Sequence, residues 1–216
     1  MNPASSADGR VSLRARFRTA TREAILDAAA GLMGAEGASQ TRMEDIAARA
    51  GVAVGTVYNY FEDRTALVLA LLETRSRTLM DALESAGDGP RARAGATAAA
   101  SFELQLEQFV ATLAAHFEAN RFLLGVLLED EQLRGVDAKS AARRTAMRRE
   151  MMVRAERLID RGIRAKALRK DNPTVYAALL LGMVRGAALA SLTTDRAATA
   201  NWTASVVRMF LHGAVR

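Results

Sequence analysis

The sequence contains no cysteine and only two histidines, His116 and His212, among its 216 residues. The absence of cysteine excludes disulfides, thiolate metal sites and a cysteine nucleophile. We also find no nucleophile spaced with a base, no metal-ligand spacing and no phosphate-cradling glycine loop. We therefore expect no catalytic residues, no metal and no cofactor, and an enzyme acting on a small apolar substrate is only a remote alternative.

Long apolar runs and aromatic residues are also scarce. No run of 18 or more apolar residues indicates a membrane span, and the first residues lack the apolar segment of a signal peptide. We therefore expect a soluble, cytoplasmic protein without a membrane partner. Half of the residues are apolar, enough for a core, but only 5% are aromatic, so clustered aromatic residues stand out.

Apolar residues recur at helical spacing along most of the chain. The first stripe consists of Ile25, Leu26, Ala29, Leu32 and Met33. Thr19 is the expected N-cap of this first helix, and Gly87, Gly89 and Pro90 mark the clearest break further on. Because no stretch shows the alternation of a strand, the sequence predicts an all-α fold of about nine helices, one of them over residues 122–132.

Residues 50–67, AGVAVGTVYNYFEDRTAL, place two tyrosines directly after a glycine turn. Short helices are predicted over residues 43–50, behind a Thr41 and Glu44 capping pattern, and over residues 53–60, and Gly51 between them suits a tight turn. This is a helix-turn-helix arrangement, whose second helix enters the DNA major groove. Tyr58 and Tyr60 are about 200° apart on a helix, so both cannot point inward.

The segment TRMEDIAARAGVAVGTVYNYFEDRTAL resembles the DNA-binding signature of the TetR family of bacterial transcriptional regulators. The matching positions are Thr41, Ile46, Ala47, Ala50, Gly51, Val52, Gly55, Thr56, Tyr58, Tyr60, Phe61 and Leu67. This resemblance implies a homodimer with an N-terminal three-helix DNA-binding domain and a larger helical domain for ligand binding and dimerisation. A weaker resemblance covers LIDRGIRAKALRKDNPTVYAALLLGMVRG in the second domain.

The resemblance also implies which residues contact DNA. Phosphate contacts are expected at Thr41, Tyr58, Tyr60 and Arg64, with Arg42 as a further electrostatic contact, and the residues nearest the bases are expected to be Val54, Gly55, Thr56 and Asn59. Arg64 replaces the usual lysine, and its alternative role is to neutralise Glu62 or Asp63. Ala53 and Val54 replace residues that are often polar or basic, so thymine methyls and DNA shape carry more of the specificity.

We divide the chain into a flexible basic arm over residues 1–18, a helix-turn-helix domain over 19–64 and a ligand-binding and dimerisation domain over 65–216. Residues 1–70 hold eight arginines and eight acidic residues, and four of these arginines lie in the arm. Such arms reach an adjacent minor groove or the DNA backbone. The alternative is a disordered, solubilising tail.

In the second domain, a stripe of small residues and an apolar stripe on the last helix predict a dimer interface of four helices around a two-fold axis. The predicted interface residues are Leu181, Gly182, Gly186, Ala190, Trp202, Val206, Met209 and Phe210. Packing within one chain is the alternative. Residues 134–170 carry thirteen basic and four acidic residues, which fits a solvated face or recognition of an anion.

The middle helices are expected to hold a ligand. The predicted lining is Phe102, Phe109, His116, Phe117, Phe122, Leu127, Met147 and Met151, each of which could equally be plain core. The sequence thus predicts a ligand-responsive regulator, a repressor that binds a palindromic double-stranded operator as a dimer and is released by a small, largely apolar effector. A constitutive DNA-binding factor without ligand control is the alternative.

Overall fold

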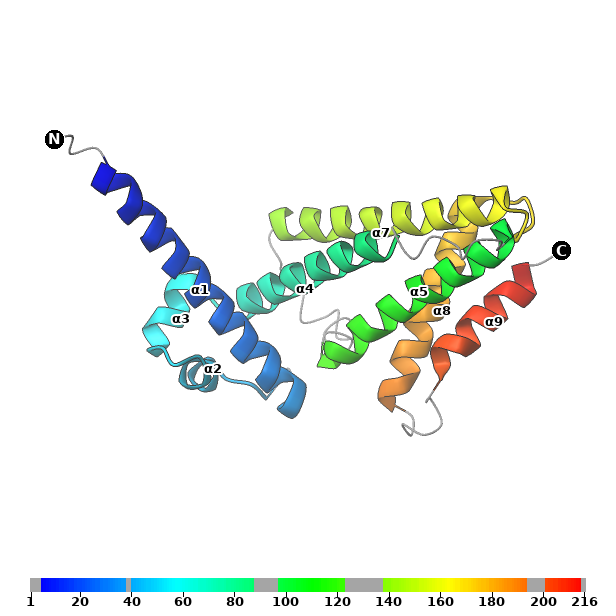
Figure 1. Ribbon diagram of the computed structural model, residues 1–216. Coiled ribbons are helices and arrows are strands. Elements are labelled where there is room, and N and C mark those ends of the chain that lie inside the picture. Colours follow the sequence, from blue (N-terminus) through cyan, green and yellow to red (C-terminus); the bar gives the residue numbers. More distant parts are fainter. Residues whose placement is uncertain (1–4, 38–39, 88–96, 123–137, 194–200, 215–216) are drawn as a thin grey trace. The chain divides into compact units, whose positions relative to one another are not determined.

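The computed structural model of the chain describes residues 5–37, 40–87, 97–122, 138–193 and 201–214. In these ranges it contains helices and no strand (Figure 1). The helices are α1 (Ser5–Glu36), α2 (Met43–Ala50), α3 (Val54–Tyr60), α4 (Arg64–Gly87), α5 (Ala98–Ala119), α7 (Ala138–Arg164), α8 (Pro173–Thr193) and α9 (Trp202–Ala214). The predicted all-α fold is confirmed. The helix predicted over residues 122–132 lies almost wholly outside the described residues.

The chain forms two compact units, and the boundary between them falls inside α4, between Leu72 and Glu73. The sequence-based boundary after Arg64 lies at the start of this same helix. The first residues of α4 therefore belong to the first unit and the remainder to the second.

The core of the first unit joins α1, α2 and α3 through fully buried apolar side chains. Ile25 of α1, Ile46 of α2 and Val57 of α3 are each 0% exposed. Gly51 ends α2 in the left-handed conformation, with φ of 68°. Its N–H donates to Ala48 O at 3.2 Å, so the turn closes as the sequence predicts.

The N-terminus of α1 differs from the predicted arm, because the helix already begins at Ser5. The hydroxyl of Thr19 donates to Ala15 O at 3.1 Å within the helix, so the prediction of Thr19 as the N-cap was wrong. Arginine and alanine favour helix, and neither glycine nor proline lies between Arg10 and Thr19 to interrupt it. The basic segment is therefore a helical extension of the first unit.

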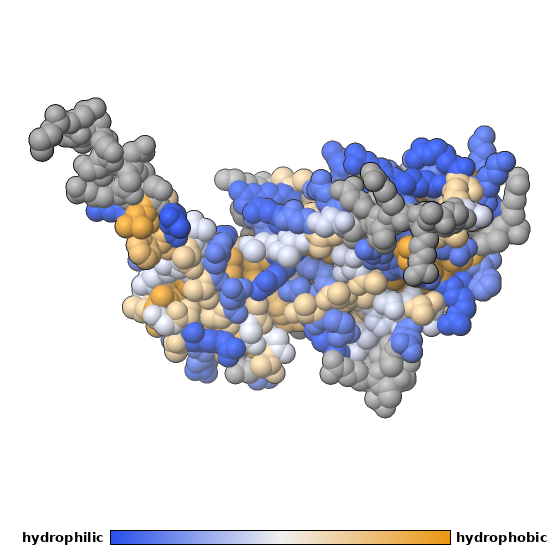
Figure 2. Space-filling model, viewed as in Figure 1, coloured by the Kyte–Doolittle hydropathy of each residue, from blue (hydrophilic) through white to orange (hydrophobic). Residues whose placement is uncertain are grey.

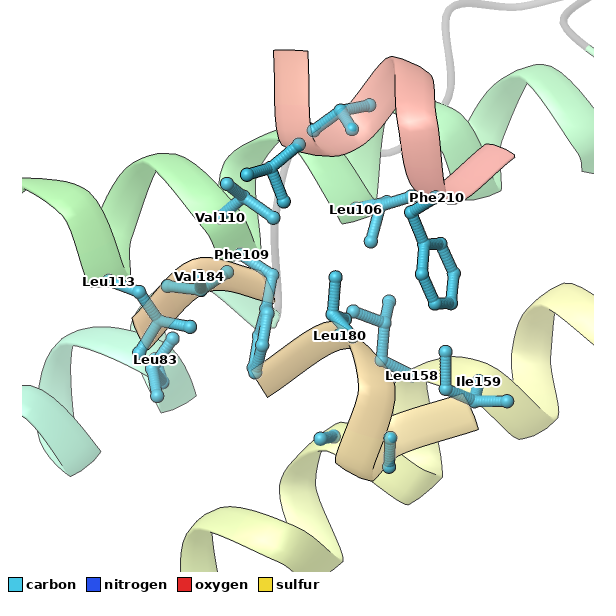
Figure 3. Close-up of a cluster of buried hydrophobic side chains, with 14 of the residues drawn as sticks. Leu83, Leu106, Phe109, Val110, Leu113, Leu158, Ile159, Leu180, Val184 and Phe210 are labelled. Atoms are coloured by element: carbon cyan, nitrogen blue, oxygen red, sulfur yellow. The ribbon is translucent and has the colours of Figure 1, made fainter. Parts of the chain in front are cut away.

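The second unit is a bundle in which α8 packs on α7 and α9, and α5 packs on α7, α8 and α9. Figure 3 shows how side chains from these helices meet in one apolar cluster. Phe109 of α5, Leu158 of α7, Leu180 of α8 and Phe210 of α9 all contribute to it. Burial of these side chains removes apolar surface from water, which stabilises the bundle.

A basic face runs along α7, where Figure 2 shows a strongly hydrophilic surface. The expected pair of Arg154 with Glu150 forms at 3.0 Å, and Arg154 also reaches Glu84 of α4 at 3.3 Å. Arg161 and Arg164 are exposed, and partial burial together with the charge of Arg164 lowers the pKa of Arg161. Much of this face is therefore solvated, and part of it pairs with α4.

One helix of the described residues, α8, is long and apolar enough to cross a membrane, contrary to the expectation from the sequence. Residues 173–191 carry Arg185 as their only charged residue, and the stretch passes by average hydropathy although polar residues interrupt it. By length and composition alone this is weak evidence for a span, because core helices of soluble proteins share these properties. Its buried residues, such as Leu180 and Val184, pack in the core of the second unit.

Candidate nucleic-acid interface

The start of α2 is built around Thr41, which is 2% exposed. Its hydroxyl donates to Gly37 O at 3.1 Å, so it does not cap α2, and Arg42 occupies the N-cap position without a side-chain hydrogen bond. The predicted capping pattern of Thr41 and Glu44 was therefore wrong. Because the side chain is buried and its hydroxyl is engaged, Thr41 holds the chain before α2 and does not offer a side-chain contact to DNA in this conformation.

Arg64, at the start of α4, also turns inward. Its Nε donates to Thr41 O at 3.4 Å, and its Nη2 is buried without a hydrogen-bond partner. Asp63 accepts the N–H of Ala66 at 2.7 Å and so caps the start of α4. Arg64 thus links the beginning of α4 to the beginning of α2, a contact that the sequence analysis did not foresee.

The short helix α3 presents a polar face. Val57 is 0% exposed and packs in the core of the unit, whereas Tyr58 is 48% exposed to solvent. Gly55 and Asn59 are exposed one turn apart, and no atom lies within 4 Å of the position that a Cβ on Gly55 would take. Val54, Thr56 and Tyr60 are half-buried. The helix predicted over 53–60 is confirmed, with Ala53 as its N-cap.

This face suits DNA because it joins uncharged donors and acceptors on one rigid element. Amide groups such as that of Asn59 pair with adenine edges in the major groove, and hydroxyls such as that of Tyr58 bind phosphates. The helix ends where Phe61, which is 3% exposed, adopts extended backbone angles and packs inward. The core contact of Phe61 therefore fixes both the length and the direction of α3.

Two arginines that sequence reasoning left without a role fasten α1 to the other helices. Arg22 lies 5.5 Å from the centre of the Phe61 ring, a cation–π contact. The guanidinium of Arg49 covers Gly31 so closely that a Cβ there would lie 3.0 Å from its Nη2. Nothing in the local sequence pattern distinguishes these arginines from solvated ones, because both contacts depend on tertiary packing.

The predicted ligand residues gather in the second unit. Phe102, Phe109 and Phe122 are buried, and Phe117, Met147 and Met151 pack partly buried against the core. Burial and the charge of Arg75 lower the pKa of His116 to about 4, and the side chain of Asn120 donates to His116 O at 2.8 Å. Leu127 lies outside the described residues. No group of three or more metal-binding side chains occurs in the described part of the chain.

The predicted dimer residues divide into two groups. Val206 and Phe210 of α9 are 6% and 5% exposed inside the core of their own chain, so their assignment to a dimer interface was wrong. The stripe of α9 faces its own bundle because α5 and α8 pack against that side. Leu181 and Trp202 are half-buried against the same core, whereas Gly182, Gly186, Ala190 and Met209 are exposed.

Two further apolar residues of α8 extend the exposed group. Val175 and Leu179 are 50% and 56% exposed, and with Gly182, Gly186 and Ala190 they follow one another at intervals of 4, 3, 4 and 4 residues. This helical spacing places them on one face, and it could have been found in the sequence by extending the small-residue stripe backwards. The structure thus brings a continuous apolar and small-residue face to the surface of α8.

Comparisons with known proteins agree with this architecture. Residues 25–71 match the family of bacterial regulatory proteins, tetR family. No curated protein matches the chain significantly.

Three solved structures share the fold across nearly their whole length. A transcriptional regulator from Saccharomonospora viridis in complex with choline has a TM-score of 0.75 at 18% identity, covering 92% of this chain and 99% of its own. FadR from Bacillus subtilis in complex with stearoyl-CoA has a TM-score of 0.66 at 19% identity, covering 88% and 98%. SmeT, the repressor of the Stenotrophomonas maltophilia multidrug efflux pump SmeDEF, has a TM-score of 0.63 at 23% identity, covering 90% and 90%. Residues 25–71, which contain the helix-turn-helix, are thus similar to the bacterial regulatory proteins of the tetR family, and the chain as a whole shares the fold of these solved regulators.

Proposed function

We propose that the chain represses transcription by binding a palindromic operator as a homodimer, and that a small, largely apolar effector releases it. The observation that carries this proposal is the short polar face of α3, held rigidly by Val57 and Phe61 and free of charged residues. A neutral face reads base edges and leaves electrostatic attraction to other parts of the domain.

We assign the contacts to DNA as follows. Val54, Gly55, Thr56 and Asn59 lie nearest the bases, and Tyr58, Tyr60 and Arg42 bind phosphates. Thr41 and Arg64 act indirectly, because their mutual hydrogen bond sets the start of α2 and of α4. This division revises the expectation from the sequence, in which both residues touched phosphate directly.

Dimerisation proceeds through the exposed face of α8, with Met209 of α9 beside it. Small residues at Gly182 and Gly186 leave open space for a second helix to approach closely, and Leu179 supplies apolar area. A two-fold axis between the two copies would present two copies of α3 to half-sites about one helical turn, or a multiple of it, apart.

The effector binds among the partly buried apolar side chains of the second unit, including Phe117, Met147 and Met151. The similar structures named above hold stearoyl-CoA and choline in their own chains. For this chain the aromatic and methionine lining favours an apolar compound. Because α4 belongs to both units, it is the element through which a ligand would change the fit of α3 to DNA.

Selection of bound duplexes from a random pool, followed by fluorescence anisotropy on the selected operator, tests the proposal. We expect a palindromic sequence and a two-to-one ratio of chain to duplex. Titration with a panel of apolar metabolites should then identify a compound that weakens operator binding, and operator should weaken the binding of that compound by the same factor. Sequence-specific binding that no compound affects would favour the constitutive factor, and absence of sequence-specific binding would contradict the proposal.

A further inference from the structure

The N-terminal half of α1 extends beyond the packed part of the first unit. Ile25 is the first buried residue along the described side chains of α1, whereas residues 13–20 are all exposed. At 1.5 Å per residue, the helix from Ser5 to Thr21 reaches about 25 Å. Arg22, directly after it, contacts Phe61, the residue that ends the recognition helix α3. The extension therefore starts beside the C-terminal end of α3.

One side of this extension carries arginines and exposed apolar residues together. Leu13 and Phe17, which are 52% and 65% exposed, lie one turn apart next to Arg14 and Arg18. In Figure 2, apolar and hydrophilic surface lie side by side where the described side chains of α1 begin. Large apolar side chains left in water beside arginines indicate a surface that meets a partner.

Helical spacing fixes the direction of this side. Arg14, Arg18, Thr21, Ile25 and Ala28 follow at intervals of 4, 3, 4 and 3 residues, and Ile25 and Ala28 are buried where α1 meets the rest of its unit. The arginine side of the extension therefore continues the side of α1 that packs on its domain. Arg16 lies outside this side of the helix, because it is about 100° from Phe17 in the direction opposite to Arg18.

The charge balance of the unit indicates what the partner is. Residues 19–64 contain four arginines and seven acidic residues, so this part of the DNA-binding unit is net negative. Residues 1–18 contain four arginines and one acidic residue. The extension is therefore where the unit gathers the positive charge that a polyanion requires. A membrane is a poorer match, because an interfacial helix needs a broad apolar face and the described side chains supply only Leu13 and Phe17.

We propose that the extension of α1 binds duplex DNA that flanks the half-site read by α3, as a rigid helix and not as a flexible arm. Arg14 and Arg18 bind phosphates, and Leu13 and Phe17 contact the apolar faces of the sugars between them. At about 3.4 Å per base pair, the extension can follow roughly seven base pairs of flanking duplex. This inference rests on the proposed DNA-binding function and adds to it a second, sequence-independent contact surface.

The test is operator binding measured by anisotropy across a salt series, for wild type, Arg14→Ala/Arg18→Ala, Arg18→Ala and Arg16→Ala. Each lost phosphate contact reduces the slope of log affinity against log salt by about 0.9, and a dimer loses two contacts for each substituted arginine. We expect Arg18→Ala to flatten the slope by about 1.8, the double variant by about twice that, and Arg16→Ala to leave it unchanged. Circular dichroism confirms that all variants keep the helix.

Trimming the DNA provides an independent readout. Wild type should lose affinity when the flanks beyond the half-sites are removed, while Arg14→Ala/Arg18→Ala should bind long and short duplexes equally. Phe17→Ala should weaken binding to the long duplex only. The inference is overturned if the Arg14/Arg18 slope equals that of wild type, if Arg16→Ala has the same effect as Arg18→Ala, or if Phe17→Ala changes only vesicle binding or self-association. If wild type binds no operator at all, the proposed function fails instead.

Discussion

Both units expose helices, but the exposed side chains are mainly polar on α2 and α3 of the first unit and largely apolar on α8 of the second. In the first unit, α2 and α3 are 8 and 7 residues long and expose polar side chains such as Asn59. In the second unit, α8 is 21 residues long and exposes Val175 and Leu179 at helical spacing. A short helix fixed by a glycine turn holds a few side chains in place for reading a groove, whereas a long one offers a stripe that only another long helix covers.

The strongest way to break this comparison is a charge in the exposed stripe of α8. We expect Leu179→Glu to yield a monomer and to reduce operator affinity by more than about 100-fold, because dimerisation would bury an unpaired carboxylate. Analytical ultracentrifugation and anisotropy measure the two effects. Leu104→Glu on α5, where the leucine is 45% exposed, is the matched control and should remain dimeric. A dimeric Leu179→Glu protein would show that α8 does not form the interface.

A smaller loss is expected from the polar surface of α3. Asn59→Ala should weaken operator binding by about 1–3 kcal/mol and leave binding to random DNA almost unchanged, because a lost amide contact affects only the base that it reads. Tyr58→Phe removes only a hydroxyl and should weaken both kinds of DNA equally, by about 1 kcal/mol. Anisotropy with operator and scrambled duplexes separates the two. A change in base preference caused by Tyr58→Phe would contradict its assignment to phosphate.

The first unit was readable from the sequence because its signals are local. Gly51 marks the turn that ends α2, and Val57 is the inward residue among the outward residues of α3 at helical spacing. Local signals could not predict the tertiary contacts of individual side chains. Thr41 was expected to contact a DNA phosphate, yet its hydroxyl donates a hydrogen bond to Gly37 O. Arg64 was also expected to contact phosphate, yet its Nε donates to Thr41 O.

The second unit was less readable because its helices are apolar on more than one side. Val206 and Phe210 fit a dimer interface and a core equally well by spacing, and the packing of α9 on α5 and α8 decides between these alternatives. The prediction of a flexible arm at the start of α1 was wrong for a different reason. An arginine-rich segment without proline fits both a helix and a charged tail, and its charge favoured the tail although helix propensity favoured the helix.

Close packing inside the second unit can be compared with an open site in the first. A Cβ on Gly162 of α7 would lie 2.6 Å from the ring of Phe102, whereas a Cβ on Gly34 of α1 meets nothing within 4 Å. We expect Gly162→Ala to lower the free energy of unfolding by about 1–3 kcal/mol through overpacking. Gly34→Ala should raise it by about 0.5–1 kcal/mol because alanine favours helix. Urea denaturation measures both, and a stabilised Gly162→Ala protein would contradict this close packing of α5 on α7.

The last prediction concerns pH and His116, the half-buried histidine of α5. Burial first, and the charge of Arg75 on α4 second, lower its pKa from 6.5 to about 4. The folded protein therefore prefers neutral His116, so its contribution to stability is complete above pH 6.5 and is lost as the pH falls from 6.5 toward about 4. Carboxylates also titrate in this window, so the informative quantity is the difference between proteins. We expect His116→Gln to lose less stability than wild type between pH 7 and pH 4, and His212→Gln, on an exposed site, to follow wild type. Thermal unfolding followed by circular dichroism at several pH values measures this difference. Parallel pH profiles for wild type and His116→Gln would show that protonation of His116 does not lower the stability of the fold, which would contradict its lowered pKa.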